Sequence, residues 1–458
     1  MKNDSKPFDP FGVGDKKWRL ILGVCFLLLF TIAGYKAVRK AEKGRTAFVR
    51  WVKHTDLILD GKTIYNVDPE HKEEGYPSLP MMALILVPFH ALGAVAGSAA
   101  WAIAKCGIIL WIFYVIVNFC RKAGVIWPPW ALVLLLILST RVFHGDITHA
   151  NNNLIIGGLI ATALWFESRG QTFRAGFIIG LAVVLKVTPG LFLIYFLFKR
   201  KWIALVGAAV SGFLFTLVVP SLFLGIGFNW ELIEMWFRQM ILPFLSDNRI
   251  NRHLTIYYNQ SIPGLLHRLL SHQPAIFDGP DGEQIYLNIL SLESATVFRL
   301  VKLASLSVLG LIIFFSRTPR DKFQNLGLIG EYALIFLGML FLSERSWKHH
   351  YVLLILPHAF ILSYLISTHY RDWRRKVPLT LLGIAAVLQL ALGEALVGAH
   401  NSDILEGYGV YIGGGFCLFA ATAFILSRLR RDGWELDPAI ASIKSGNEAE
   451  TDSDEPVQ

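Results

Sequence analysis

The sequence predicts an all-α polytopic membrane protein, a bundle of about twelve transmembrane helices whose outer-face loops carry short interfacial helices. Two features of composition support this fold class. Of the 458 residues, 54% are hydrophobic and 17% are charged, whereas soluble domains carry about 25% charged residues. The mean hydropathy is +0.49. A third feature is that apolar windows long enough to cross a bilayer recur along nearly the whole chain, which a soluble core cannot absorb.

Net charge and cysteine content limit the kinds of partner and cofactor that we expect. The formal net charge of +9 is expected beside anionic lipid in a membrane protein, so we expect the bilayer as a partner and no nucleic acid. Cys25, Cys106, Cys120 and Cys417 lie in or at the ends of apolar segments without a CxxC pair. They are typical of small core residues, and we expect neither a metal site nor a cofactor.

The first helix sets the expected orientation. Residues 1–18 are polar, with Lys16 and Lys17 at the membrane edge, which predicts a cytoplasmic N-terminus. The retained first span, Leu20–Ala37, then leads to a first outer loop at about 39–79. Within it Thr46–Leu59 has apolar residues at helical spacing, which predicts an interfacial helix. The many cations of this loop oppose the positive-inside rule.

The following spans include one interrupted segment. A Gly97-Ser98 turn is expected to join the second and third spans. In the segment Phe173–Phe198, Lys186 is costly at that depth and Pro189 frees a backbone carbonyl, so we expect a broken or re-entrant element. A second outer loop is expected at about 229–296. The other spans are predicted near Met81–Ala96, Ala99–Cys120, Trp130–Phe143, a run ending at Trp165, Trp202–Phe228, Phe298–Phe315, Leu326–Leu342, Tyr351–Ile366, Leu379–Gly398 and Val410–Leu426.

Basic ends after the later spans alternate with less basic loops, which predicts a cytoplasmic C-terminus in the cell (plasma or inner) membrane. The membrane domain is expected over 19–428, followed by a polar, disordered tail over 429–458. Counting every apolar run as a full crossing places His144–Asn153 on the inner face, opposite the first loop. If both segments form one site, some run must fail to cross, and we expect the Lys186–Pro189 break or the short fourth span.

The stretch Ser343–His350 is the strongest candidate site. It places Arg345, His349 and His350 between two apolar runs, at the depth of lipid headgroups. Arg matches phosphate oxygens as a fork, and His donates from a ring nitrogen, so the stretch can bind a lipid phosphate, with Lys186 as a further cation. The alternative is an anchor turn in which Trp347 simply prefers the interface.

Other polar clusters lie at His144–Asn153 and Asn259–Ser261. Together with the cationic stretch they suit an enzyme that acts on a lipid-linked substrate at the outer surface. Each also has a plain structural interpretation, since the Asn151–Asn153 run can cap a helix and Asn259-Gln260 can form an ordinary turn.

Several short motifs share an order with a known family. They are Gly61…Tyr65…Tyr76-Pro77, His149-Ala-Asn151-Asn152-Asn153-Leu, Gly180…Lys186-Val-Thr-Pro189, Asn259-Gln260-Ser261 and the Ser343–His350 stretch. In these the chain resembles the polyprenol-phosphate-sugar-dependent glycosyltransferases of family 87 (the DUF2029 type), which have the GT-C fold. The resemblance implies transfer of a hexose, often mannose, from a polyprenyl-phosphate donor to a lipid or glycan acceptor, with inversion. It implies substrate contacts at Tyr65, Tyr76, Asn151, Asn153, Asn259 and Gln260.

An inverting transfer needs a carboxylate to take the acceptor hydroxyl proton. The family's base is an Asp followed by an aromatic residue in the first outer loop, where this chain has Ala47-Phe48. Asp56 and Asp60, one helical turn apart, are the nearest carboxylates, and we expect the base among them. Two other functions stay open: a transporter or flippase for a lipid-linked substrate, and a non-catalytic relative that serves as a partner.

Overall fold

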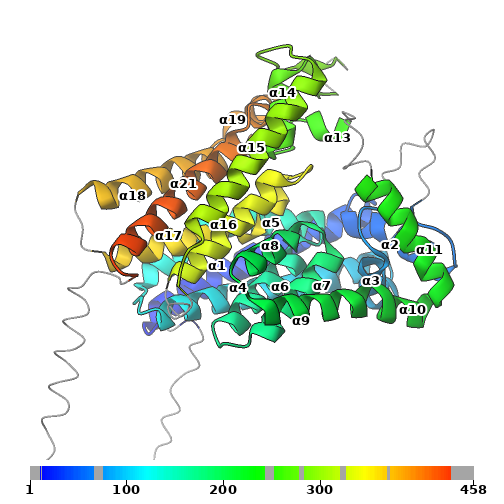
Figure 1. Cartoon of the computed structure of the whole chain (residues 1–458), viewed down its shortest axis with the longest axis horizontal. Coiled ribbons are helices and arrows are strands. Elements are labelled where there is room, and N and C mark those ends of the chain that lie inside the picture. The colour runs from blue at the N-terminus through cyan, green and yellow to red at the C-terminus, as the bar shows by residue number, and fades with distance from the viewer. Residues whose placement is uncertain are drawn as a thin grey trace, which may run out of the picture.

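The computed structural model describes residues 11, 13–65, 76–242, 252–277, 283–319, 326–368 and 372–434. Within that part the chain is helical apart from turns and one short antiparallel hairpin, β1 (Pro274–Ile276) and β2 (Ile285–Tyr286). Figure 1 shows tilted helices packed side by side, with α13 and α14 standing beyond one end of the bundle. The all-α prediction is therefore confirmed. The predicted tail over 429–458 lies outside the described residues beyond Trp434.

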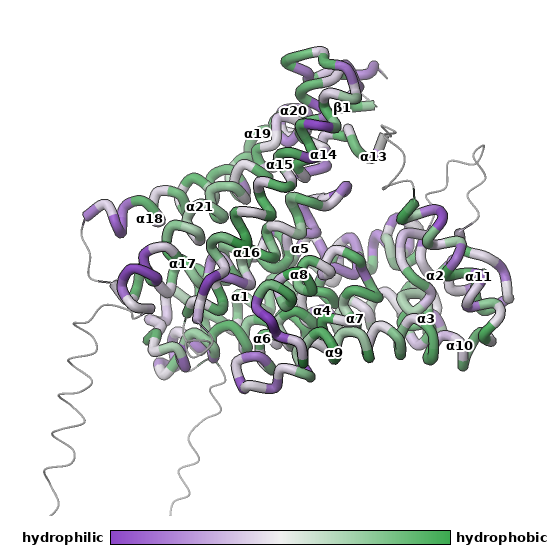
Figure 2. The backbone as a smooth tube through the Cα atoms, in the orientation of Figure 1, coloured by the Kyte–Doolittle hydropathy of each residue, from purple (hydrophilic) through white to green (hydrophobic). Residues whose placement is uncertain are grey.

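Among the residues that the structure describes, six helices are long and apolar enough to cross a membrane. Figure 2 shows apolar residues along the helix bodies and hydrophilic ones gathered at ends and loops. The six, with a π-helical turn joining α9 to α10, are α1 (Lys16–Glu42), α4 (Ala94–Lys122), α5 (Pro129–His149), α9–α10 (Trp202–Leu224), α15 (Ser294–Phe315) and α21 (Val410–Arg431). The protein is thus a multi-pass membrane protein, as the composition predicts.

Shorter helices complete the bundle and its loops. The apolar ones are α3 (Pro80–His90), α6 (Asn153–Glu167), α7 (Thr172–Leu185), α8 (Leu191–Phe198), α16 (Gly327–Leu342) and α17 (Ile355–Ser367). Another short helix, α18 (Trp373–Ala386), begins with the basic run Arg374–Lys376. Almost every side chain of α16 is buried, which explains why it is apolar on all sides. The others are α2 (Ala47–Leu59), α11 (Ile226–Trp236), α13 (Arg252–Thr255), α14 (Ile262–Leu270), α19 (Glu394–Val397) and α20 (Ala399–Gly407).

We name the two ends of the bundle. The end that carries the loop between α16 and α17 is called the pocket face, and the other end is called the opposite face. At the opposite face, Lys201 pairs with Glu167 at the end of α6, and Lys199 pairs with Glu331 near the start of α16 at 2.8 Å. Helices α6 and α7 pack against each other in opposite directions. Helix α7 therefore runs from the opposite face to the pocket face, and α8 runs back to the opposite face, where Lys199 and Lys201 form their ion pairs.

The tip of this α7–α8 hairpin is the predicted break. Lys186 has extended backbone angles (φ −157°, ψ 125°) and ends α7. A single 3-10 turn, Thr188–Gly190, then reverses the chain into α8. The break that Lys186 and Pro189 predict is confirmed, and it places Lys186 in the lining of the pocket.

A second short segment resolves the placement of His144–Asn153. With 11 residues, α3 is only about 16 Å long, and after Gly93 (φ 82°) the chain folds back into α4. Gly97, predicted as a turn residue, lies inside α4, so close to α3 that a Cβ would come within 2.2 Å of the Phe89 carbonyl oxygen. We infer that α3 is the run that does not cross before this cluster, whereas we expected that run at the fourth span or the Lys186 break.

Because α3 does not cross, the first loop and the end of α5 share the pocket face. Phe48 of α2 contacts the Trp101 ring, with centroids 6.2 Å apart. Trp101 Nε1 in turn donates to the Ala150 carbonyl oxygen at 3.2 Å. Ala150 ends α5 in the left-handed conformation (φ 53°) and directs the next residues toward the pocket.

Candidate active site

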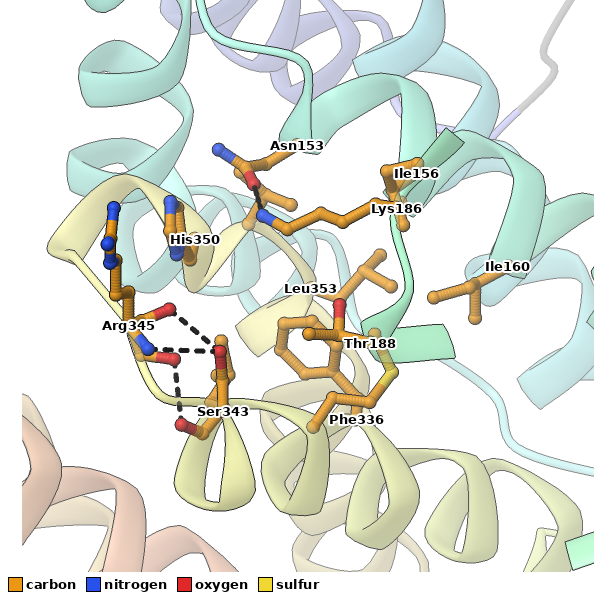
Figure 3. A pocket seen from close by; sticks show the side chains of 15 residues that line it. Asn153, Ile156, Ile160, Lys186, Thr188, Phe336, Ser343, Arg345, His350 and Leu353 are labelled. Atoms are coloured by element: carbon orange, nitrogen blue, oxygen red, sulfur yellow. Dashed lines mark hydrogen bonds between the residues drawn. The ribbon is translucent and has the colours of Figure 1, made fainter. Parts of the chain in front are cut away.

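A pocket opens where α6, the tip of the α7–α8 hairpin and the end of α16 meet the loop Ser343–Leu354. The polar residues of its lining are Asn153, Lys186, Thr188, Ser343, Arg345, Ser346 and His350. The apolar ones are Ile156, Ile160, Phe336, Met339, Leu340, Val352 and Leu353. Figure 3 shows Lys186 reaching across toward Asn153, with His350 and Arg345 on the opposite wall.

A buried network positions Lys186. Its Nζ donates to Asn153 Oδ1 at 2.6 Å, and Asn153 Nδ2 donates to Asp146 Oδ2 at 3.0 Å. Asp146 is also paired with Lys105 at 2.7 Å, and both side chains of this pair are fully buried. Because Asp146 is already neutralised by Lys105, the network keeps one net positive charge, carried by Lys186 at the pocket wall.

Three imidazoles lie between α5 and the pocket. The rings of His149 and His349 are stacked with centroids 5.0 Å apart, and those of His349 and His350 lie 4.9 Å apart edge to face. Asn151 Nδ2 is 2.9 Å from His349 Nε2, so with the amide donating, this nitrogen accepts. Burial, reinforced by the charge of Lys186, lowers the pKa of His349 and of His350 well below its ordinary value.

The tautomer of His350 suits a donor role. The Trp347 backbone N–H donates to His350 Nδ1 at 3.3 Å, which leaves the proton of the neutral ring on Nε2. A neutral imidazole of this kind donates one hydrogen bond into the pocket. The positive charge at the pocket wall therefore comes from Lys186 and Arg345, not from the histidines.

The loop that carries Arg345 is held from outside the bundle. Asn259 Nδ2 donates to the Glu344 carbonyl oxygen at 2.9 Å, and Asn259 Oδ1 accepts from the Ser346 N–H at 3.0 Å. The Gln260 N–H donates to the Ser346 carbonyl oxygen at 2.6 Å. The Tyr351 hydroxyl donates to the Gln260 carbonyl oxygen at 2.7 Å. We call this set of contacts the loop clamp.

Arg268 in turn organises the loop clamp. Its guanidinium is fully buried and donates to the carbonyl oxygens of Ile256 at 3.0 Å, Asn259 at 3.2 Å and Gly407 at 2.5 Å. A guanidinium satisfied by backbone carbonyls fixes the turn before α14 against α20. Asn259 and Gln260 are fully buried and do not line the pocket, so the structure places them as supports of the cationic loop.

The other predicted substrate contacts divide between the pocket and the first loop. Asn153 lines the pocket, and Asn151 lies behind it on His349. Tyr65 and Tyr76 are buried in the first loop, with ring centroids 6.4 Å apart and the Tyr65 hydroxyl donating to the Ser78 carbonyl oxygen at 2.6 Å. They order the start of α3 and do not reach the pocket lining.

The two predicted bases lie near the end of α2, away from the pocket lining. Asp56 Oδ1 is 2.7 Å from Nε2 of His90, at the end of α3, and its side chain is 55% exposed. Asp60 follows α2 and pairs with Lys62 at 3.3 Å. Of the residues that line the pocket in the described part of the chain, none is a carboxylate.

Lys105, Asp146 and Arg268 were missed as candidate residues in the sequence. Lys105 could have been recognised as a candidate, because it lies in the middle of a long apolar run where a charge is costly without a partner. Asp146 was visible only as one polar residue of the His144–Asn153 cluster. Arg268 lies in the predicted second outer loop, in the segment that forms α14, and its role depends on packing against α20 that no local pattern reveals.

A pocket lined by two cations, a neutral donor and apolar side chains matches a ligand with an anionic head and a hydrocarbon tail. No group of His, Cys, Asp or Glu that could hold a metal ion occurs within the described residues. The fold and pocket are those expected of a membrane enzyme that acts on a lipid-linked anion. The model of glycosyltransferase family 87 matches residues 76–343, more than half of the chain. The protein belongs to glycosyltransferase family 87.

Two characterised relatives come from Mycolicibacterium smegmatis. A polyprenol-phosphate-mannose-dependent alpha-(1-2)-phosphatidylinositol pentamannoside mannosyltransferase is 25% identical over 328 residues, which cover 69% of this chain and 68% of the relative. A polyprenol-phosphate-mannose-dependent alpha-(1-2)-phosphatidylinositol mannoside mannosyltransferase is 23% identical over 402 residues, 82% of this chain and 80% of the relative. No solved structure matches this chain.

Proposed function

We propose that this glycosyltransferase moves a hexose, specifically mannose, from a polyprenyl-phosphate donor to a lipid or glycan acceptor, with inversion, at the outer membrane face. The observation that carries the proposal is that Lys186, Arg345 and His350 line one pocket together with apolar side chains. Both relatives are named as mannosyltransferases that depend on polyprenol-phosphate mannose, which supports the choice of donor.

The proposed chemistry divides between the acceptor and the leaving group. An acceptor hydroxyl oxygen forms the new bond to the anomeric carbon, while the bond from that carbon to the phosphate oxygen breaks with its electron pair. The polyprenyl phosphate leaves with an additional negative charge. Lys186 and Arg345 stabilise that charge, and His350 Nε2 donates a hydrogen bond to it.

The acceptor proton needs a base, and we propose Asp56 or Asp60. Both are exposed carboxylates of the first loop, on the same face of the bundle as the pocket. Asp56→Asn should abolish transfer without loss of expression or folding if Asp56 is the base, because an amide cannot take the proton. The measurement is label transfer by purified variants.

Normal turnover in Asp56→Asn with loss in Asp60→Asn moves the role to Asp60. Normal turnover in both variants contradicts a first-loop base. Glu344, half-exposed beside Arg345 in the cationic loop, is then the next carboxylate to replace.

The outer-face location rests on the basic helix ends. Arg121 and Lys122 end α4, and Arg428, Arg430 and Arg431 end α21, all at the opposite face. Such basic clusters favour the cytoplasmic side of a membrane. We therefore place the opposite face, with the start of α1 and the end of α21, in the cytoplasm, and the pocket on the outside.

The test of the function is transfer of radiolabelled mannose from a short-chain polyprenyl-phosphate mannose in membranes that contain the protein. Lys186→Ala should lower kcat/KM by about 10- to 150-fold, the loss typical of one charge-assisted hydrogen bond. Lys302→Ala, which removes an exposed cation of α15, is the matched control and should leave kcat/KM unchanged.

The same assay separates the alternatives. A flippase would move labelled donor across the membrane without a new labelled product. A non-catalytic relative would produce neither result in membranes that supply donor and acceptor. Equal transfer by wild type and Lys186→Ala would contradict the assignment of the pocket to the donor.

A further inference from the structure

The positive charge of the donor pocket depends on two residues that do not line it. Lys105 lies in α4 and Asp146 in α5, and both side chains are fully buried. Lys105 Nζ lies 2.7 Å from Asp146 Oδ1 and also donates to the Asp146 carbonyl oxygen at 2.7 Å. The other carboxylate oxygen, Oδ2, accepts from Asn153, whose Oδ1 holds Lys186 Nζ at 2.6 Å. One row of contacts therefore joins the buried ion pair to the pocket wall.

Lys105 prevents Asp146 from neutralising Lys186. A buried carboxylate needs a cation, because an unpaired charge in a low-dielectric interior is costly. Asp146 is separated from Lys186 by a single amide group, since Asn153 contacts both. With Lys105 in place the carboxylate already has a partner, so the charge of Lys186 is left for a ligand. Among the described residues that line the pocket, no carboxylate competes for it.

Arg345 supplies the second positive charge of the pocket wall. Glu344 Oε1 lies 4.0 Å from Arg345 Nε, and the two side chains are 41% and 36% exposed. An exposed pair at this distance contributes little, and Glu344 does not line the pocket. His350 adds a hydrogen-bond donor without a charge, because its ring is neutral. The described pocket wall thus carries two positive charges.

Two positive charges match the leaving group better than they match the donor. The phosphate of a polyprenyl-phosphate sugar is a diester with a single negative charge, whereas a phosphate monoester carries about −1.5 to −2 charges at pH 7. The second charge develops only as the bond to the sugar breaks. An interaction that strengthens during bond breaking accelerates the reaction, whereas equal binding of the donor and the transition state does not raise kcat.

We propose that Lys105 and Asp146 are positioning residues that keep two positive charges on the pocket wall, so that the pocket binds the departing polyprenyl phosphate in preference to the intact donor. This inference rests on the proposed function for the identity of the donor and the leaving group. It gives the buried pair, which does not line the pocket, a role in the reaction through Asn153 and Lys186.

The first test uses the full chain without substitutions, in neutral detergent. The probes are farnesyl phosphate and its methyl ester, which share the hydrocarbon tail and differ in the second negative charge of the phosphate. Wild type should bind farnesyl phosphate about tenfold or more tighter than the ester, because the second charge meets a second cation. Equal affinities would overturn the inference.

The second test changes the charge of the network. Lys105→Met leaves Asp146 to pair with Lys186, so it should remove the preference for farnesyl phosphate. It should also lower kcat by about 10- to 150-fold, the loss typical of one charge-assisted hydrogen bond, with a smaller effect on KM for the donor. Lys105→Met/Asp146→Asn removes both charges of the pair and leaves Lys186 free for the ligand. The double variant should therefore regain the preference and most of the turnover.

Lys201→Met is the matched control for the loss of a buried ion pair. Lys201 pairs with Glu167 at the opposite face, and these side chains are 5% and 3% exposed. Breaking this pair should lower the thermal unfolding temperature without altering the ratio of the two probe affinities. The ratio is measured on folded protein, so a purely structural role of Lys105 would leave it unchanged as well.

An unchanged affinity ratio in Lys105→Met would overturn the inference, and so would equal changes in Lys105→Met and Lys201→Met. If Lys105→Met does not fold, wild type and the double variant still decide, because both must prefer farnesyl phosphate. That preference in a protein that transfers no mannose would support the charge assignment and refute the proposed function. Mannose transfer by a wild type that binds both probes equally would refute the inference and keep the proposed function.

Discussion

His349 and His350 act as neutral groups, and this has a consequence for pH dependence. Burial holds their pKa values well below 6.5 in the folded protein, whereas the unfolded chain titrates near 6.5. Between the two values the unfolded state binds more protons, so the free energy of unfolding increases with pH up to that point. Acidification below about pH 6.5 should therefore destabilise the protein, by up to about 1.4 kcal/mol per pH unit for each histidine.

The measurement is the thermal unfolding temperature between pH 5 and pH 7.5. His350→Gln should flatten this dependence, because it removes one of the groups that must be protonated on unfolding. His272→Gln replaces an exposed histidine that stacks on Tyr286 and should leave the slope as in wild type. An unchanged slope in His350→Gln would show that the ring is not held neutral.

At the scale of single residues, the sequence predicted the polar residues that line the pocket better than the residues that hold the pocket's loop in place. Lys186 was predicted from its cost at membrane depth, and Arg345 and His350 from their ability to bind a lipid phosphate. The structure brings all three to one pocket. Asn259 and Gln260 were predicted as substrate contacts, yet their side chains hold backbone groups of neighbouring segments. Polar residue type reveals that a buried position needs a partner, but not whether that partner is a ligand or a carbonyl oxygen.

At the scale of elements, the loop clamp is the feature that sets the pocket geometry. Gly264 of α14 lies against Asn259, and a Cβ there would come within 2.6 Å of the Asn259 Cγ. Gly264→Ala should therefore displace Asn259 and loosen its hold on the Ser343–His350 stretch. We expect KM for the donor to rise by about tenfold and stability to fall by about 1–3 kcal/mol, the usual cost of overpacking.

Gly310→Ala provides the control for this change. Gly310 lies in α15, where a Cβ would meet nothing within 4 Å, so the substitution should leave KM unchanged and raise helix propensity slightly. Steady-state kinetics with both variants separates the two effects. A Gly264→Ala variant with wild-type KM would show that the loop clamp does not position Arg345.

The same scale shows where periodicity was informative and where it was not. The interfacial helix α2 and the break after α7 follow from local signals, an amphipathic pattern and a Lys-x-x-Pro segment. The length of α3 does not. Its apolar run continues through Gly97 into α4, and the boundary at Gly93 depends on close packing of Gly97 on the Phe89 carbonyl oxygen. Hydropathy alone does not detect this boundary, so it assigns the end of α3 and the start of α4 to the wrong segments.

At the scale of the whole molecule, two short segments determine which polar clusters meet. α3 returns on the side from which it came, and the α7–α8 hairpin enters and leaves by the opposite face. Together they bring residues from the first loop, α5 and the α16–α17 loop to one face, as Phe48, Trp101 and Ala150 show directly. A count of apolar runs cannot establish this arrangement, because it treats each run as one crossing.

The arrangement predicts a labelling pattern for single cysteines introduced after the four free cysteines are replaced. Lys62→Cys, after α2, and Leu92→Cys, in the exposed turn between α3 and α4, should react with a membrane-impermeant maleimide from the same side. Arg200→Cys, in the exposed turn after α8, should react only from the other side, because Lys199 and Lys201 at that turn pair with residues of the opposite face. Reaction of Leu92→Cys together with Arg200→Cys would mean that α3 crosses the membrane. The first loop and the donor pocket would then lie on different faces, and neither Asp56 nor Asp60 could act as the base in that pocket.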